Sequence, residues 1–183
     1  MRGAVALGVT ALFSKLDCVF KVILLQKEFL LCGLGLVLAL WQILTLPCIV
    51  MWAGGQRLYL GEAAAGFPLS LRFIHSVQKT PVEEFLAVDE DRQHFVLKAT
   101  KYQSFGVGLP FDEHEGEFVQ EGDYYWLRGQ DRKFPRLDFR VGVGTELSMN
   151  LGGKSFPLYE NYKPGTLVSV ELMPLWKGLV MHE

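Results

Sequence analysis

The longest apolar run of the chain lies near its N-terminus. Residues 29–55 include no charged residue, and Gln42 and Pro47 are among the few breaks in a series of leucine, valine, isoleucine and small residues. An α-helix rises about 1.5 Å per residue, so about 20 apolar residues cross the roughly 30 Å hydrocarbon layer of a membrane. The pattern therefore predicts a single transmembrane helix over residues 29–54.

A cleaved signal peptide is the main alternative for this segment. Such a peptide has an apolar core of about 7–15 residues, closely followed by a small-residue cleavage site. The run here is longer, and the only later Ala-x-Ala, at residues 63–65, lies well downstream. Leu31 and Pro47 precede the cysteines at positions 32 and 48, where lipidation would need a small residue. We therefore expect an uncleaved signal-anchor.

The charges that flank the run predict its orientation. Four cations precede it, whereas two lie in the first stretch after it: Arg2, Lys15, Lys21 and Lys27, then Arg57 and Arg72. The positive-inside rule places the N-terminus in the cytoplasm, so we expect a single-pass protein of the bacterial inner (cytoplasmic) membrane. The C-terminal part would lie in the periplasm or outside the cell. All three cysteines precede residue 55, so that part would fold without disulfides.

Two segments flank the predicted anchor. Residues 1–28 form a cytoplasmic leader, in which Leu12, Leu16 and Ile23 follow a helical spacing. This spacing suggests an interfacial helix on the inner membrane surface, and an unstructured leader is an equal alternative. Residues 55–66 are interpreted as a linker.

Residues 67–183 alternate apolar and polar positions with a period of two, which is typical of β-strands. Strands are predicted over residues 67–75, 82–88, 95–99, 124–127, 137–143, 146–151, 155–156 and 167–172. Gly152 and Gly153 predict a tight hairpin, because a two-residue turn needs positive φ angles that glycine adopts easily. No stretch of this part has the pattern of an amphipathic helix.

This pattern predicts an all-β extracytoplasmic domain, a small sandwich or barrel, preceded by a single transmembrane helix. The mean hydropathy of the chain, +0.20, comes from the apolar run, and the rest is mildly acidic. A net charge of −2 argues against nucleic acid as a partner.

A candidate binding or acid/base pair lies between the first two predicted strands. If Leu71 faces Val88 across the hairpin, His75 faces Glu84, and cross-strand Cβ atoms lie about 5 Å apart. A register shifted by one residue would choose Glu83 instead. Such a pair could bind a ligand or transfer protons, and it could equally be a structural pair at the rim of the core.

A second candidate segment follows the third strand. Ser104 could approach His75 if its loop folds over the hairpin, whereas Ser76 points to the opposite face of the strand from its neighbour. Gly106 and Gly108 would let the backbone approach a ligand closely, and a tight structural bend is the simpler interpretation.

The acidic residues around His114, together with Asp91 and His94, offer oxygen and nitrogen ligands. They lack the spacing of a zinc or EF-hand motif, so a solvated acidic loop is the simpler interpretation. The sequence predicts no metal site and no cofactor.

The segments 75–84 and 104–110, with His-Ser-Val, Pro-Val-Glu and Ser-x-Gly-x-Gly-Leu-Pro, resemble the hallmark stretches of domain-of-unknown-function family number 1850. Members of that family often accompany, or are fused to, TAXI-type TRAP transporters. The resemblance implies an accessory role in solute uptake through contact with the permease, the solute-binding protein or a ligand. It carries no established catalytic residues.

Three functions therefore remain open from the sequence. We favour a membrane-anchored accessory protein without enzymatic activity. Its ligand-binding candidates are His75, Ser76, Glu83, Glu84, Ser104, Gly106 and Gly108. The alternatives are an envelope enzyme that uses His75, Glu84 and Ser104, and a sensor of a metal or small ligand.

Overall fold

A computed structural model describes residues 26–104 and 116–181 of the chain. It contains two compact units, an N-terminal helix that ends at Thr45 and a β unit that begins at Leu46. The predicted leader lies almost entirely outside the described residues.

The N-terminal helix is described over Gln26–Thr45 and is long and apolar enough to cross a membrane. The predicted C-terminal boundary at residue 54 is wrong, because Pro47–Ala53 form a β-strand. Proline disfavours the helical conformation of the residue before it, so the helix ends just before Pro47.

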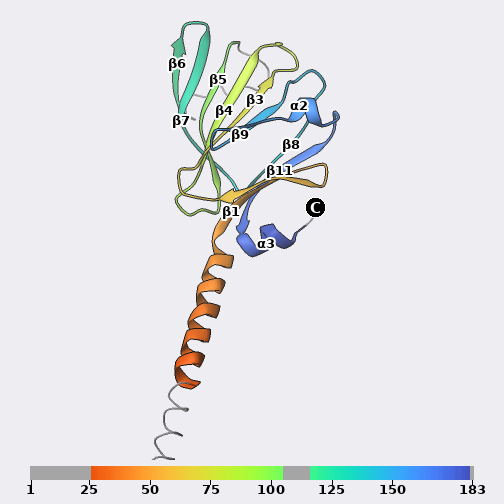
Figure 1. The fold of residues 1–183 in the computed structure, drawn as a ribbon. Helices are drawn as coiled ribbons and strands as arrows, with labels where there is room; N and C mark the ends of the chain where they lie inside the picture. Colours follow the sequence, from red (N-terminus) through yellow and green to blue (C-terminus); the bar gives the residue numbers. More distant parts are fainter. Residues whose placement is uncertain (1–25, 105–115, 182–183) are drawn as a thin grey trace, which may run out of the picture. The chain divides into compact units, whose positions relative to one another are not determined.

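The described residues of the β unit form eleven strands in two antiparallel sheets, drawn in Figure 1. The strands are β1 (Pro47–Ala53), β2 (Gln56–Glu62), β3 (Pro68–Ile74), β4 (Pro81–Val88), β5 (Phe95–Tyr102), β6 (Glu117–Glu121), β7 (Tyr124–Phe134), β8 (Arg136–Arg140), β9 (Ser148–Leu151), β10 (Lys154–Pro157) and β11 (Leu167–Pro174). One sheet has the order β2-β1-β11-β8 and the other β10-β9-β3-β4-β5-β7-β6. Two short helices, α2 (Leu158–Asn161) and α3 (Leu175–Val180), complete the described part of the unit.

Strand β1 is buried on both of its faces. Ile49 and Met51 point into the main core, whereas Val50 and Trp52 pack in a second cluster on the other side of the sheet. Strands buried on both faces have continuous apolar sequences rather than alternating ones. This explains why residues 47–53 resemble a continuation of the apolar helix in the sequence.

Strand β2 occupies the segment that was interpreted as a linker, so that prediction is also wrong. It pairs with β1 through a hairpin whose turn contains Gly54 and Gly55, both with positive φ. The β unit therefore begins at Leu46 rather than at residue 67.

The two sheets pack face to face around one core, which confirms the all-β prediction and selects the sandwich over the barrel. Ile49 and Val170 contribute to this core from the four-stranded sheet, and Leu69 and Met149 contribute from the seven-stranded sheet. One of the places where the chain passes from one sheet to the other is Pro135, between β7 and β8.

The glycine hairpin is confirmed as well. Leu151 pairs with Lys154 around Gly152 and Gly153, whose φ angles are +56° and +88°. The predicted strands correspond to β3, β4, β5, β7, β8, β9, β10 and β11, with shifted ends. The short strand β6 and the two short helices were not predicted.

Candidate functional site

The hairpin of β3 and β4 has a different register from the predicted one. Leu71 pairs with Glu84, and Phe73 pairs with Val82. The predicted pairing of His75 with Glu84 is therefore wrong. The sequence alone did not fix the register, because both strands carry several apolar residues in alternation and more than one alignment buries them.

His75 lies just after β3 and organises the turn to β4. Its Nδ1 atom accepts hydrogen bonds from the backbone N–H groups of Val77 (3.4 Å) and Gln78 (3.2 Å). Its own backbone N–H donates to the carbonyl of Thr80, and the N–H of Lys79 donates to the carbonyl of His75, both at 2.9 Å. These contacts give His75 a role in the structure of the turn.

The loop after β5 reaches this same turn. The Ser104 hydroxyl lies 3.5 Å from the side-chain oxygen of Gln78. Ser104 therefore approaches the hairpin, as predicted, but its partner there is Gln78 and not His75. Ser76 is exposed in the turn. Gly106 and Gly108 lie outside the described residues.

Glu83 and Glu84 point to opposite faces of the seven-stranded sheet. Glu83 pairs in register with Arg72 and Lys101 of the neighbouring strands, and with them it lines a small polar hollow. Glu84 points instead toward the space between the two sheets. Only Glu84 of this pair therefore faces an apolar environment.

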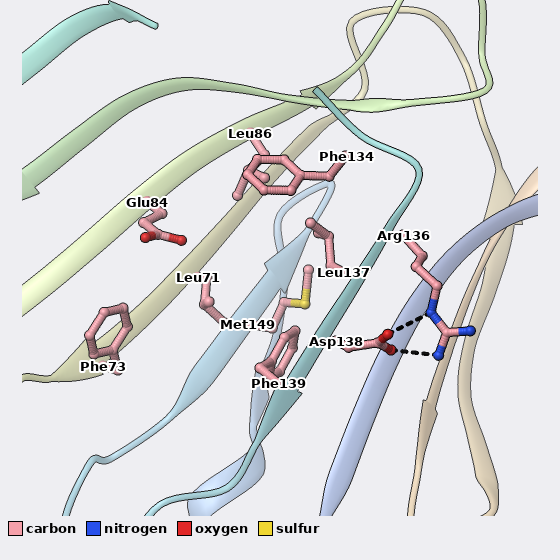
Figure 2. Close-up of a pocket in the computed structure, with 10 residues that line it drawn as sticks. All are labelled: Leu71, Phe73, Glu84, Leu86, Phe134, Arg136, Leu137, Asp138, Phe139 and Met149. Carbon is pink, nitrogen blue, oxygen red and sulfur yellow. Dashed lines mark hydrogen bonds and ion pairs between the residues drawn. The ribbon is translucent and has the colours of Figure 1, made fainter. Parts of the chain in front are cut away.

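Figure 2 shows the pocket that contains Glu84, which has a volume of about 480 Å³. Strands β3 and β4 form one side with Leu71, Phe73, Glu84 and Leu86, and β8 faces them. Ten residues line it: Leu71, Phe73, Glu84, Leu86, Phe134, Arg136, Leu137, Asp138, Phe139 and Met149. Its size lies within the range of about 300–1,000 Å³ typical of small-molecule sites, and most of its wall is apolar.

The Glu84 carboxyl is the one acidic group on the seven-stranded-sheet side of this pocket. Burial raises its pKa above the usual value of 4.5, because a low-dielectric surrounding disfavours the charged form, and the positive charge of Arg132 partly opposes this effect. Among the described residues, none forms a hydrogen bond or an ion pair with this carboxyl. The group can therefore accept a donor from a bound molecule.

The polar residues of β8 satisfy one another on the other face of that strand. Arg136 Nε lies 2.6 Å from Asp138 Oδ2, and the Ser169 hydroxyl donates to Asp138 at 2.8 Å. The hydrogen bond from Arg136 is the main reason why the pKa of Asp138 is lowered. In Figure 2 this pair points away from Leu137 and Phe139, although all four residues are among those that line the pocket.

The sequence indicated Glu84 as a candidate but not the pocket around it. Leu137 and Phe139 were assigned only to a strand and Phe134 to no element, and nothing in their spacing indicated that they face Glu84. A useful signal was present in β4, where Glu84 interrupts the apolar series Val82, Leu86 and Val88. A charged residue on a core face requires either a partner or a cavity.

One group of described residues could hold a cation at the turn between β4 and β5. Ligand atoms of Asp89, Asp91 and His94 lie within 4.8 Å of one another. However, His94 Nδ1 is 2.7 Å from Asp91, and Lys133 Nζ is 2.5 Å from Asp89. These contacts already give the carboxylates of the cluster partners within the protein. The acidic loop around His114 lies outside the described residues.

Residues 69–158 match the model of a family described as Domain of unknown function (DUF1850). The matched stretch runs from β3 to α2 and includes all 10 residues that line the Glu84 pocket. Neither a curated protein nor a solved structure matches the chain.

Proposed function

We propose that this chain, similar to DUF1850 over its central 69–158 stretch, is a membrane-anchored ligand-binding protein. The helix Gln26–Thr45 would hold the β unit at the outer surface of the cytoplasmic membrane. The pocket between the sheets would bind a small, mostly apolar molecule with one hydrogen-bond donor. The observation that carries this proposal is a carboxyl group without a partner among the described residues, placed in an apolar pocket.

The unpaired carboxyl favours a binding role over a purely structural one. Leaving a buried polar group without a partner costs about 1–3 kcal/mol, and the cost is larger for a charged group. Glu84 would thus destabilise the empty β unit, and a donor on a bound molecule would relieve that cost. Functional sites commonly contain groups whose pKa is shifted in this way.

The chemistry of the pocket suggests a class of ligand. Leu71, Phe73 and Phe139 offer aliphatic and aromatic contacts, whereas Glu84 offers an acceptor. An amine or a hydroxyl on an apolar body satisfies both parts of the site. A carboxylate ligand of the same shape would meet the negative charge of Glu84 when that group is ionised.

Thermal unfolding of the full chain in lipid nanodiscs tests this proposal with three water-soluble probes of one shape: phenethylamine, phenethyl alcohol and phenylacetate. A ligand that binds only the folded state raises Tm with its concentration. We expect the amine and the alcohol to raise Tm more than the carboxylate does at neutral pH. Glu84→Gln should remove the preference for the amine, whereas the control Glu83→Gln should keep it.

A second variant separates binding in the pocket from unspecific binding. Leu137 faces the pocket and is half-buried, so Leu137→Trp should fill the space and abolish the shift with every probe. Equal shifts in the wild type and in Leu137→Trp would contradict the proposal, as would the absence of any shift in the wild type.

The resemblance to the family supports a broader proposal, that the protein assists TRAP-type solute uptake by contact with the permease or the solute-binding protein. The orientation predicted from the flanking cations would place the β unit on the side where such binding proteins work. Co-purification of the full chain with either component tests this role. Normal uptake in a deletion strain, together with no recovered complex, would contradict it.

A further inference from the structure

The short helix α3 packs one of its sides against the outer face of the four-stranded sheet. Gly178 is buried there, and a Cβ atom at this position would lie 3.0–3.1 Å from side-chain atoms of Val50, Cys48 and Leu60. Arg57 donates a hydrogen bond to the carbonyl of Gly178. Glycine therefore allows the helix to lie directly on the sheet.

The opposite side of α3 is apolar as well, although it is exposed. Trp176, Leu179 and Val180 have the i, i+3, i+4 spacing of one helix face, and they are 48%, 46% and 73% exposed. Leu46, at the start of the β unit, is 50% exposed. Lys177 is the cation of the helix. A soluble domain gains nothing from such a face, because water is a poor solvent for it.

The position of α3 in the chain indicates what this face contacts. The backbone N–H of Leu175, the first residue of α3, donates to the carbonyl of Leu46 at 2.8 Å. Leu46 directly follows Thr45, the last residue of the apolar helix, and consecutive Cα atoms are about 3.8 Å apart. The first turn of α3 thus lies where the β unit is attached to the anchor.

We propose that the exposed face of α3 lies in the interface of the same membrane that the N-terminal helix crosses. Tryptophan is enriched at the level of the lipid headgroups, and lysine can extend its ammonium group to them. The spacing of the apolar residues suits a helix that lies along the surface, and the charge of Lys177 suits anionic lipids. This inference rests on the proposed anchoring and adds a second attachment of the β unit to the lipid.

Fluorescence quenching by brominated lipids tests this contact in the full chain. The protein is reconstituted in vesicles of phosphatidylcholine and phosphatidylglycerol, with and without bromine on the acyl chains. In the Trp41→Phe background, quenching reports on Trp176, because Trp52 is buried and Trp126 lies in β7 of the other sheet. We expect strong quenching in this background. Adding Trp176→Phe should remove most of the quenching, whereas adding Trp126→Phe instead should leave it.

A complementary variant separates this inference from the anchoring. The single variant Trp176→Phe keeps Trp41, which lies in the apolar helix, so its quenching reports insertion of the anchor. Quenched Trp41 with unquenched Trp176 would overturn the α3 contact and leave the anchor intact. Unquenched Trp41 would instead contradict the anchoring.

A second copy of the chain is the other occupant that an apolar face could have. In that case Trp176 would escape the brominated lipids, and Leu179→Lys would convert an oligomer into a monomer in detergent. Either result would overturn the lipid contact. If α3 lies on lipid, Leu179→Lys should reduce the quenching of Trp176 without a change in oligomeric state.

Discussion

Replacement of Glu84 by glutamine tests whether this carboxyl is an unpaired group in an apolar pocket. Glutamine keeps the size and shape of glutamate but carries no charge. Glu83→Gln is a matched control, since the neighbouring residue lies on the same strand and points to the opposite face of the sheet. We expect Glu84→Gln to stabilise the β unit at neutral pH, and Glu83→Gln to be neutral or slightly destabilising.

The direction of the pH effect follows from the pKa of Glu84. Burial raises this pKa in the folded state above the usual value of 4.5, so the folded protein holds the proton more tightly than the unfolded chain does. Stability therefore falls as the pH rises from 4.5 through the raised pKa, and the loss is complete above it. The advantage of Glu84→Gln should grow over the same range and disappear at lower pH.

The magnitude is set by the burial of an ionised group without a partner, which costs about 1–3 kcal/mol or more. Glu84 is only half-buried, and the positive charge of Arg132 offsets part of the cost. We therefore expect about 1 kcal/mol at neutral pH, at the lower end of this range. For a domain of this size, such a change raises Tm by about 3–6 °C.

Thermal unfolding of the full chain in nanodiscs, followed by tryptophan fluorescence at mildly acidic and mildly alkaline pH, measures this difference. The reasoning would be refuted if Glu84→Gln changed Tm equally at both pH values. It would also be refuted if Glu83→Gln stabilised the protein as much as Glu84→Gln, because Glu83 lies in a polar hollow beside Arg72 and Lys101.

Three further substitutions test other parts of the structure. Met51→Ala in β1 should lower the free energy of unfolding of the β unit by about 2–5 kcal/mol, since Met51 is fully buried in its core. An unchanged free energy of unfolding would indicate that this segment belongs to the membrane anchor and not to the β unit. Gly178→Ala should lower the free energy of unfolding by about 1–3 kcal/mol, because the added methyl group overpacks α3 against Val50. Urea unfolding measures this loss, and an unchanged stability would mean that α3 does not pack tightly on the sheet. His75→Ala should lower the free energy of unfolding by about 0.5–1.5 kcal/mol, because it removes the acceptor for two backbone N–H groups. Hydrogen exchange should become faster at the amide of Val77. Unchanged exchange there would contradict the role of His75 in the turn.

The sheet register illustrates a limit of the sequence. Alternation of apolar and polar residues identified β3 and β4 and correctly placed Leu71, Phe73 and Glu84 on the core side. It did not determine which residues pair across the hairpin, because several alignments bury the same faces. The turn length decides this, and the turn depends on the contacts of His75 with the backbone around it.

The boundary of the anchor illustrates a second limit. Residues 29–53 are uncharged and mostly apolar, and hydropathy alone does not distinguish a membrane helix from a strand that is covered on both faces. Pro47 was the local signal that the helix must end before it. What covers β1 comes from segments far along the chain, β11 on one edge and α3 over the outer face.

The sequence by itself determined the local features of this protein: an apolar helix, a series of alternating strands, a glycine hairpin and a charged residue on a core face. These depend on the residues of one segment, whose periodicity and turn chemistry can be read without the rest of the chain. The tertiary structure decided that Pro47–Ala53 belongs to the sandwich, that Glu84 faces a pocket and that His75 holds the turn between β3 and β4. Those outcomes depend on contacts between segments distant in sequence, because burial and register are properties of the packed sheets and not of any single strand.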